Sequence, residues 1–408
     1  MRVLFVNRFY RPDHSATSQL LTDLAEYLAA EGFAVSVIAS AALYSNPEER
    51  LPLEETLAGV SVRRVGTSRF GRGSLVGRAV DYLTFYFSAA GRLLSEVRRG
   101  DVVVAKTDPP LISVLCGLVC RLKGARLITW LQDLYPEVAT AHGLSLGLFG
   151  PLLRSLRDGS LRQARANVAI SPAMAARVRA AGVPAKRTEV VQNWTDDHAI
   201  IPAPPEANAL RDAWGLKGRL VIGYSGNLGR AHEYETLLGA AERLTPDLPV
   251  TFLFIGGGHN SGPLMQAVKA RGLESRFLFQ PYQPRERLSL SLGVPDLHWV
   301  SLLPEFEGLI FPSKFYGAAA AGRGILVVAD PAGEMAQLVA RRDCGVAVRI
   351  GDADGLARLL SELAADPARA RAMGVRARAF IDQEASRAMA LSAWGTILRN
   401  LEPEGSRK

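Results

Sequence analysis

The chain has 408 residues, of which 48% are hydrophobic and 22% are charged, and its formal net charge is +8. This length and apolar content suffice for two domains with separate cores, and the composition excludes disorder except in the last few residues. No apolar run approaches the ~20 residues of a transmembrane helix, and Met1 leads into a strand pattern rather than a signal peptide, so we expect a cytoplasmic protein.

The first half alternates short apolar strands with longer helical patterns, which is typical of a parallel sheet covered on both faces. Leucines at 20, 21, 24 and 28 recur at helical spacing, so residues 18–30 are predicted to form an amphipathic helix. The other predicted elements are strands at residues 3–6, 35–39, 60–65, 101–105, 126–130 and 189–191, and a long helix at 76–96.

The second half repeats this pattern after a proline-rich stretch, Ile-Pro-Ala-Pro-Pro at 201–205, which favours neither a helix nor a central strand. We therefore predict a linker at 193–208 and domains at 1–200 and 201–385, with a C-terminal helix, 386–408, that packs back on the first domain. Predicted strands lie at 220–224, 250–255, 277–279, 297–302 and 325–328, and predicted helices at 235–244, 264–270, 313–321, about 353–381 and 384–401.

The three cysteines stand at no metal-ligand spacing, which argues against a disulfide framework or a zinc site. Cys116 and Cys120 are four residues apart in an apolar run, so we expect them to share one buried helix face. A reducing compartment fits this cysteine usage.

Basic residues are concentrated in the first half, where residues 63–187 hold 20 basic and 7 acidic side chains. This excess indicates an anionic partner, although a solvated basic face is the alternative. Nucleic acid is not expected, because no helix-turn-helix, RNP or zinc-finger pattern is present. Residues 69–99 interleave arginines with aromatic and aliphatic residues, which suits an anionic membrane surface, or else a core-facing helix with a wet basic edge.

Three glycine-rich segments of the second half are candidates for binding a ligand. Gly-Tyr-Ser-Gly-Asn-Leu-Gly-Arg at 223–230 follows a predicted strand and precedes a predicted helix, so close backbone approach, a helix N-terminus and Arg230 together favour a diphosphate ligand. Phe-Ile-Gly-Gly-Gly at 254–258 is a weaker signal of the same kind. It is not a G-x-G-x-x-G fingerprint, and a dinucleotide site is not supported.

The third segment spans residues 305–317 and contains a glycine loop followed by Pro312 and Ser313. Ser313 is predicted to be the N-cap of the helix that follows. Lys314 falls in the first turn of that helix, where a cation opposes the helix dipole, so its position indicates an anionic partner.

The combination of these motifs resembles the glycosyltransferase family 4 proteins of bacterial polysaccharide synthesis, in particular those that make colanic acid and O-antigen. Three further stretches agree: Asn-Arg-Phe-Tyr-Arg-Pro-Asp at 7–13 with Ser-Ala-Thr-Ser-Gln-Leu at 15–20, Asp-Leu-Tyr-Pro-Glu at 133–137, and Gln-Asn-Trp-Thr-Asp at 192–196. The resemblance runs from residue 1 to about 395. No single piece is specific, but the combination is.

This resemblance implies a GT-B fold, in which two Rossmann-like domains face a cleft, and retaining transfer from a nucleotide-sugar, usually a UDP-sugar, without a metal. It implies an N-terminal acceptor domain and a C-terminal donor domain, with Arg230 on the diphosphate and Glu307 at the sugar. The donor-binding residues implied are Gly226, Asn227, Gly229, Gly256, Gly257, Gly258, Pro281, Tyr282, Gly308, Leu309, Ile310 and Ser313. Arg230, Lys314, Asp133 and Glu307 are the catalytic candidates, with Asp13, His14 and Ser15 on the acceptor side.

The sequence departs from the family pattern at two places. Many members carry two glutamates eight residues apart, where this chain has Leu309 and Gly317, so Glu307 is the candidate for the sugar contact. The usual basic pair near the first motif is replaced by Asn227 and His232, with Arg230 between them. We interpret both changes as variation within a subfamily.

The predicted reaction breaks a bond to a diphosphate, so fixed cations and dipoles can supply most of the catalysis. Asp133 is the first candidate for activating the acceptor, although it is as readily a turn or cap residue. The expected partners are a nucleotide-sugar, a polyprenyl-diphosphate-linked saccharide and an anionic membrane, with peripheral attachment at the inner face of the cytoplasmic membrane. Sugar-nucleotide epimerisation and a degenerate nucleotide-sugar-binding subunit are the alternatives.

Overall fold

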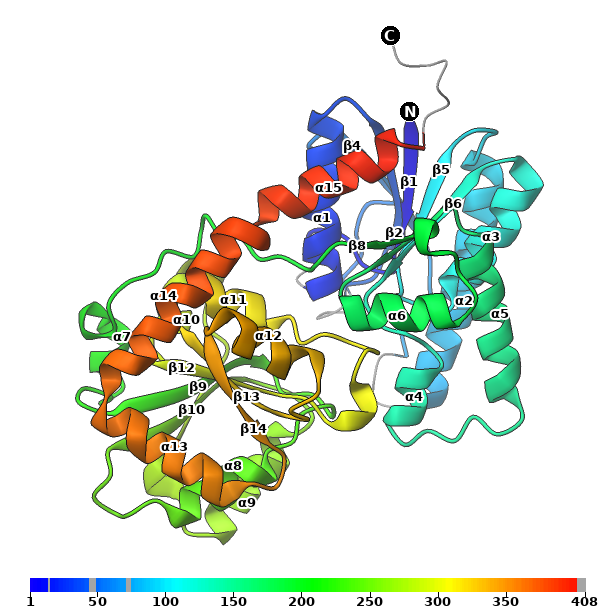
Figure 1. Ribbon diagram of the computed structural model, residues 1–408. Coiled ribbons are helices and arrows are strands. Elements are labelled where there is room, and N and C mark those ends of the chain that lie inside the picture. The colour runs from blue at the N-terminus through cyan, green and yellow to red at the C-terminus, as the bar shows by residue number, and fades with distance from the viewer. Residues whose placement is uncertain (14, 44–48, 71–74, 402–408) are drawn as a thin grey trace. The chain divides into compact units, whose positions relative to one another are not determined.

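The computed structural model describes residues 1–13, 15–43, 49–70 and 75–401. Within this part of the chain, contacts define two compact units, each built around one sheet with helices on both faces (Figure 1). The first unit contains Met1–Gln192, Gly308–Ile310 and Ala390–Lys408, and the second contains Asn193–Glu307 and Phe311–Met389. The predicted α/β class with two Rossmann-like domains is confirmed.

The sheet of the first unit has eight strands in the order β3-β4-β2-β1-β5-β6-β7-β8, and all pairs are parallel except β3 with β4. Its strands are β1 (Arg2–Val6), β2 (Ala34–Ser40), β3 (Glu54–Leu57), β4 (Val60–Val65), β5 (Val102–Ala105), β6 (Arg126–Leu131), β7 (Ala166–Ala169) and β8 (Thr188–Val190). The helices are α1 (Ala16–Ala30), α2 (Leu75–Glu96), α3 (Ile112–Lys123), α4 (Glu137–Ala141), α5 (Phe149–Gln163), α6 (Pro172–Ala180) and most of α15 (Arg387–Arg399).

Sequence periodicity correctly predicted which faces of α1 and α3 are buried. The leucines at 20, 21, 24 and 28 of α1 all lie in the core. Cys116 and Cys120 share the buried face of α3, where they pack with Phe85 of α2 against β1 and β5. The strands β3 and β7 and the helices α4, α5 and α6 were not predicted.

The sheet of the second unit has six parallel strands in the order β11-β10-β9-β12-β13-β14. The strands are β9 (Leu220–Asn227), β10 (Val250–Gly257), β11 (Phe277–Gln280), β12 (Leu297–Ser301), β13 (Gly324–Ala329) and β14 (Gly345–Arg349). The helices are α7 (Ala209–Ala213), α8 (Glu235–Arg243), α9 (Ser261–Ala270), α10 (Leu288–Leu292), α11 (Lys314–Ala320), α12 (Glu334–Arg342), α13 (Ala353–Ala365) and α14 (Pro367–Glu384).

The second unit differs from the prediction in three ways. The single helix predicted at about 353–381 is two helices, because the Asp366 side chain accepts the Ala368 N–H and Pro367 starts a new helix. The strands β9 and β10 continue through the glycine motifs to Asn227 and Gly257. The strand β14 and the helices α7, α10 and α12 were not predicted.

No helix in the described part of the chain is long and apolar enough to cross a membrane.

Candidate functional site

The glycine motifs of the second unit meet at the carboxyl ends of β9 and β10. Gly226 pairs with Gly256 in parallel register, and their φ angles are +134° and +122°. A Cβ on Gly256 would overlap the carbonyl oxygen of Gly226, and a Cβ on Gly258 would lie 2.5 Å from the backbone nitrogen of Leu228. The glycines therefore let two protein backbones approach each other, as well as leaving room for a ligand.

The helix N-terminus predicted directly after the first motif is not there. The strand β9 ends at Asn227 and α8 begins only at Glu235, so seven residues separate the two elements. Helix propensity could not predict this loop, because hydrogen bonds from side chains elsewhere in the unit stabilise residues 228–234. Arg230 is exposed in this loop and makes no hydrogen bond or ion pair with any other described residue.

His232 fixes the loop that carries Arg230. Its Nδ1–H donates to the carbonyl oxygen of Ser301 at 2.8 Å, and its Nε2 lies 3.2 Å from the Tyr224 hydroxyl, whose single proton is shared between Nε2 and the carbonyl oxygen of Asn227 at 2.7 Å. Burial and, to a smaller extent, the charge of Lys314 lower the pKa of His232 to about 4, although the hydrogen bond to the Ser301 carbonyl acts in the opposite direction. His232 is therefore neutral near pH 7 and positions the loop rather than supplying charge.

The ammonium group of Lys314 lies at the glycine cluster, which is the group formed by Gly226, Gly256 and Gly258. A Cβ on Gly226 would lie 2.5 Å from the Lys314 Nζ, so the ammonium group rests on the backbone at the end of β9. Burial lowers the pKa of Lys314, and no carboxylate in the described residues pairs with it. A buried ammonium without a counter-ion is costly, and an anionic ligand would remove that cost.

Tyr282 presents an aromatic ring beside the same turn. Its ring carbons lie 3.0 Å and 3.5 Å from the Cβ positions of Gly256 and Gly257, and 61% of the residue is exposed. The backbone N–H of Gly257 donates to the phenol oxygen, while partial burial raises the pKa of the hydroxyl. The neighbouring Pro281 is exposed. A flat, anchored and accessible ring can stack on a planar base.

The segment around residue 307 shows two features that the sequence did not predict. The Glu307 Oε2 accepts the backbone N–H of Glu334 at 3.3 Å, so this carboxylate lies at the N-terminus of α12. Ser313 stands at the N-cap position of α11, as predicted, but its side chain makes no capping bond. Its backbone is already helical, which prevents the extended geometry of a capping serine.

The residues between Glu307 and Phe311, Gly308–Ile310, belong to the first unit by their contacts. The carbonyl of Leu309 accepts the backbone N–H of Leu134 at 3.1 Å. Gly308 has a φ of +69°, and a Cβ there would lie 2.8 Å from the Nε of Arg177. Only glycine suits a positive φ in such close contact.

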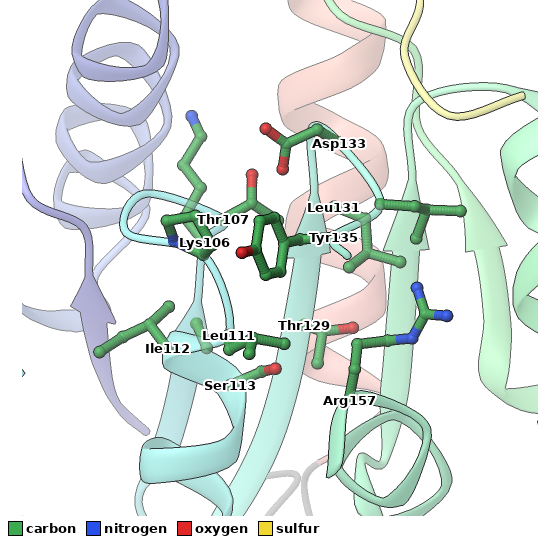
Figure 2. Close-up of a pocket in the computed structure, with 13 residues that line it drawn as sticks. Lys106, Thr107, Leu111, Ile112, Ser113, Thr129, Leu131, Asp133, Tyr135 and Arg157 are labelled. Atoms are coloured by element: carbon green, nitrogen blue, oxygen red, sulfur yellow. The ribbon is translucent and has the colours of Figure 1, made fainter. Parts of the chain in front are cut away.

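A second candidate site is a hollow of the first unit at the carboxyl ends of β5 and β6, shown in Figure 2. The Asp133 carboxyl lies beside the Thr107 hydroxyl, and its Oδ1 is buried without a hydrogen-bond partner among the described residues. Burial raises the pKa of Asp133 to about 6, and the charge of Asp108 raises it while the Thr107 hydrogen bond lowers it. The hollow is lined by Ala105, Lys106, Thr107, Pro110, Leu111, Ile112, Ser113, Thr129, Leu131, Asp133, Leu134, Tyr135 and Arg157.

The Asp133 carboxyl therefore combines an available oxygen with a pKa close to neutrality. A carboxylate of this kind can accept a hydrogen bond, or a proton, from a hydroxyl group that enters the hollow. Arg157 does not compete for it, because its guanidinium is paired with Glu137 at 2.7 Å and Asp158 at 2.6 Å.

The acceptor-side candidates near the N-terminus have local partners. The Asp13 Oδ1 accepts the backbone N–H of Ser15 at 2.7 Å, and the Ser15 hydroxyl accepts the N–H of Ser18 at the start of α1. His14 lies outside the described residues. These contacts give Asp13 and Ser15 a structural role in the turn that leads into α1.

Sequence reasoning missed Lys106, which is almost completely buried next to the hollow. Its ammonium donates to the carbonyl of Thr17 at 2.8 Å and lies 3.7 Å from the ring centroid of Trp130. Trp130 in turn packs edge-on against Trp394 of α15, with the ring centroids 4.9 Å apart. A lysine directly after the apolar run 102–105 was the available signal.

No group of three or more His, Cys, Asp or Glu side chains gathers as metal ligands in the part of the chain that the structure describes. Two cationic side chains belong to this part of the second unit, Lys314 in contact with Gly226 and Arg230 in the loop after β9.

Comparison with known proteins identifies both halves. A glycosyl transferase 4-like domain matches residues 16–194, and a domain of the glycosyl transferases group 1 matches residues 207–380. The chain is 27% identical to the "Probable glycosyltransferase WbjE" of Pseudomonas aeruginosa over 72% of its length and 74% of that protein. It is 26% identical to the "Putative colanic acid biosynthesis glycosyl transferase WcaI" of Escherichia coli (strain K12), over 83% and 86%.

Among solved structures, Anabaena HepE in complex with UDP has the same fold, with a TM-score of 0.72 and 17% identity over 98% of this chain and 100% of that one. The two domain matches together cover most of the chain, and the two sheets described above agree with them. The chain therefore belongs to the GT-B glycosyltransferases, with a glycosyl transferase 4-like domain followed by a domain of the group 1 family.

Proposed function

We propose that this glycosyltransferase moves a sugar, with retention of configuration and without a metal, from a UDP-sugar to a polyprenyl-diphosphate-linked saccharide. The observation that carries the proposal is the half-buried Lys314 ammonium, which lies on the backbone of Gly226 without a carboxylate partner among the described residues. The diphosphate of a nucleotide-sugar is an anion that would compensate this charge.

The proposed reaction breaks the bond between the sugar C1 and the diphosphate oxygen and forms a bond between C1 and the acceptor oxygen. Negative charge grows on the diphosphate as the first bond breaks, so Lys314 and Arg230 stabilise the transition state more than the ground state. The backbone amides of Gly308–Ile310 are proposed to contribute further positive dipoles. Because two side chains supply the positive charge, this proposal needs no metal ion.

The proton of the acceptor hydroxyl is assigned to Asp133 in this proposal. Its pKa of about 6 leaves the carboxyl mostly ionised at pH 7 yet still basic enough to take part in proton transfer. Glu307 is proposed to contact the donor sugar, with its carboxylate held by the backbone N–H of Glu334.

The uridine assignment rests on Tyr282 and Pro281, whose exposed surfaces flank the glycine turn and suit a small planar base. HepE, which has this fold, is known in complex with UDP and with UDP-glucose. A GDP-mannose-dependent mannosyltransferase of Mycolicibacterium smegmatis is also similar to this chain, at 26% identity. Uracil and guanine are therefore the two bases that a test has to distinguish.

The acceptor assignment is supported by WcaI, whose name places it in colanic acid biosynthesis. We propose a role in the synthesis of exopolysaccharide, capsule or O-antigen repeats at the inner face of the cytoplasmic membrane, with peripheral attachment. The excess of basic residues at 63–187 is consistent with an anionic membrane surface.

The test is incubation of the purified protein with a panel of UDP-, GDP- and TDP-sugars, followed by measurement of released nucleotide. We expect slow hydrolysis of a UDP-sugar, and loss of that activity in Arg230→Ala with the fold intact. The matched control is Arg358→Ala, which removes an exposed arginine of α13 outside the site. Nucleotide binding without turnover would instead indicate a binding subunit, and wild-type activity of Arg230→Ala would contradict the assignment of the site.

A further inference from the structure

Two loops at the carboxyl ends of β9 and β10 contact each other in the second unit. One is the loop between β9 and α8, which carries Arg230, and the other is the turn between β10 and α9. The side-chain nitrogen of Asn260, in this turn, donates to the carbonyl oxygens of Gly229 at 3.0 Å and of His232 at 3.2 Å. Because Arg230 lies between these two residues in the sequence, one carboxamide holds the backbone on both sides of it.

The close approach of the turn to the loop depends on Gly258. This glycine has a φ of +132°, and a Cβ on it would lie 2.5 Å from the backbone nitrogen of Leu228 and 2.6 Å from its carbonyl oxygen. The backbone N–H of Asn260 donates to that same carbonyl oxygen at 3.0 Å. A side chain at position 258 would push the turn away and would carry Asn260 out of reach of the loop.

The side chain of Asn260 bonds to this loop and not to its own helix. Its amide nitrogen is identified by its surroundings, because both atoms that face it are carbonyl oxygens, which can only accept. Asparagine is favoured at a helix N-cap because its side-chain oxygen can accept a backbone N–H of the first turn. Asn260 stands at the N-cap position of α9 but makes no such bond, and its backbone is helical. Helix capping therefore does not account for this side chain.

The rest of the loop backbone is held by β12 and the residues that follow it. The Leu303 N–H donates to the carbonyl of Ala231 at 3.0 Å, and the Ser301 hydroxyl accepts the N–H of Glu233 at 3.0 Å. The Arg230 guanidinium, in contrast, is exposed and makes no hydrogen bond or ion pair with any other described residue. An available cation on a fixed backbone lowers the ordering cost of binding an anion.

We infer that Asn260 is a positioning residue, which acts on the diphosphate of the nucleotide-sugar by fixing the loop that presents Arg230. This inference rests on the proposed function, in which Arg230 binds the diphosphate. It assigns a role to a residue outside the three glycine-rich segments. Without the two bonds from its side-chain nitrogen the loop has more conformations, and binding has to order it first. The donor then binds more weakly and reacts more slowly, although the unit keeps its fold.

The test is Asn260→Ser, because serine is an equally good N-cap but is too short to reach the two carbonyl oxygens. The affinity for UDP in calorimetric titration and the kcat/KM for release of nucleotide should each fall by roughly 10- to 100-fold. Hydrogen exchange of the amides at 228–234 should become faster. The matched control is Gln266→Ser, which removes an exposed carboxamide from α9 itself and should leave all three measurements unchanged.

A double variant separates positioning from a general contribution to stability. If Asn260 acts through Arg230, Asn260→Ser/Arg230→Ala should bind UDP like Arg230→Ala alone, within about twofold. If Asn260 only stabilises the second unit, the losses of the two single variants should multiply in the double variant.

Three results would overturn the inference. They are wild-type UDP affinity and nucleotide release in Asn260→Ser, unchanged hydrogen exchange at 228–234 in that variant, and losses that multiply in the double variant. The proposed function can fail separately. If the wild type releases no nucleotide from any UDP-, GDP- or TDP-sugar, the proposed function is contradicted, while faster exchange in Asn260→Ser still supports the assignment of Asn260 to the loop.

Discussion

Replacing Lys314 by methionine tests the charge at the glycine cluster most directly. Methionine keeps the unbranched length of the side chain and removes only the ammonium group that lies beside Gly226. No carboxylate among the described residues shares this charge, so a diphosphate loses its nearest cation in the variant. Removal of one preorganised group of this kind typically costs on the order of 10²–10³ in rate, and we expect turnover of the donor to fall by that factor.

The same substitution should stabilise the protein without its ligand. Burial lowers the pKa of Lys314 below the ordinary value of 10.5, so the protonated lysine destabilises the folded state. This destabilisation is complete at pH values below the folded-state pKa and disappears as the pH rises to 10.5. Lys314→Met should therefore have a higher Tm than the wild type at pH 7, and the difference should shrink as the pH is raised.

Calorimetric titration with UDP, nucleotide-release kinetics and thermal unfolding between pH 7 and pH 10 measure these effects. The matched control is Lys269→Met, at an exposed position on α9, which should leave all three measurements unchanged. The reasoning would be refuted by Lys314→Met that binds UDP and releases nucleotide like the wild type. A variant with a lower Tm at pH 7 would refute the claim that the buried charge lacks compensation.

Three further substitutions test other parts of the structure. The kcat/KM of the wild type should fall as the pH drops below about 6, the pKa of Asp133, and Asp133→Asn should lose transfer to the acceptor while it keeps donor binding. Gly256→Ala should lower the free energy of unfolding by about 1–3 kcal/mol or more in denaturant titrations, because of its φ of +122°, whereas Gly262→Ala has open space and should be neutral. Trp394→Ala should lower it by about 3–5 kcal/mol, because the buried edge-on contact with Trp130 is lost; an unchanged unfolding midpoint would refute that contact.

Local sequence signals were sufficient for most of the fold. Apolar runs and leucines at helical spacing predicted most strands of both sheets and the buried face of α1, since the pattern of buried side chains follows the period of the helix or strand. The sequence-based prediction failed where the structure depends on only one or two residues. Residues 353–381 looked like one helix, although Asp366 and Pro367 divide it, and Ser313 looked like an N-cap although its backbone is helical.

The site was predictable as a set of residue types but not as a set of contacts. The glycine motifs of the second half and Lys314 indicated an anion site. Asp133 was proposed as a catalytic residue although the sequence says nothing about the side chains around it. The motif around Arg230 was expected to open a helix directly, and it forms a loop held by His232 and Ser301 instead. A loop of this kind depends on hydrogen bonds from distant residues, which no local pattern contains.

The sequence alone determined that the chain has two α/β halves, and it predicted an anion site near the glycines of the second half. Only the tertiary structure decided that Gly256 makes room for the Gly226 carbonyl, that the Lys314 ammonium lies half-buried beside Gly226, and that Phe87 faces outward while Phe85 faces the core. The physical reason is that periodicity and propensity act between near neighbours. Burial, pKa and backbone contact depend on what lies opposite, and that partner comes from another strand or helix.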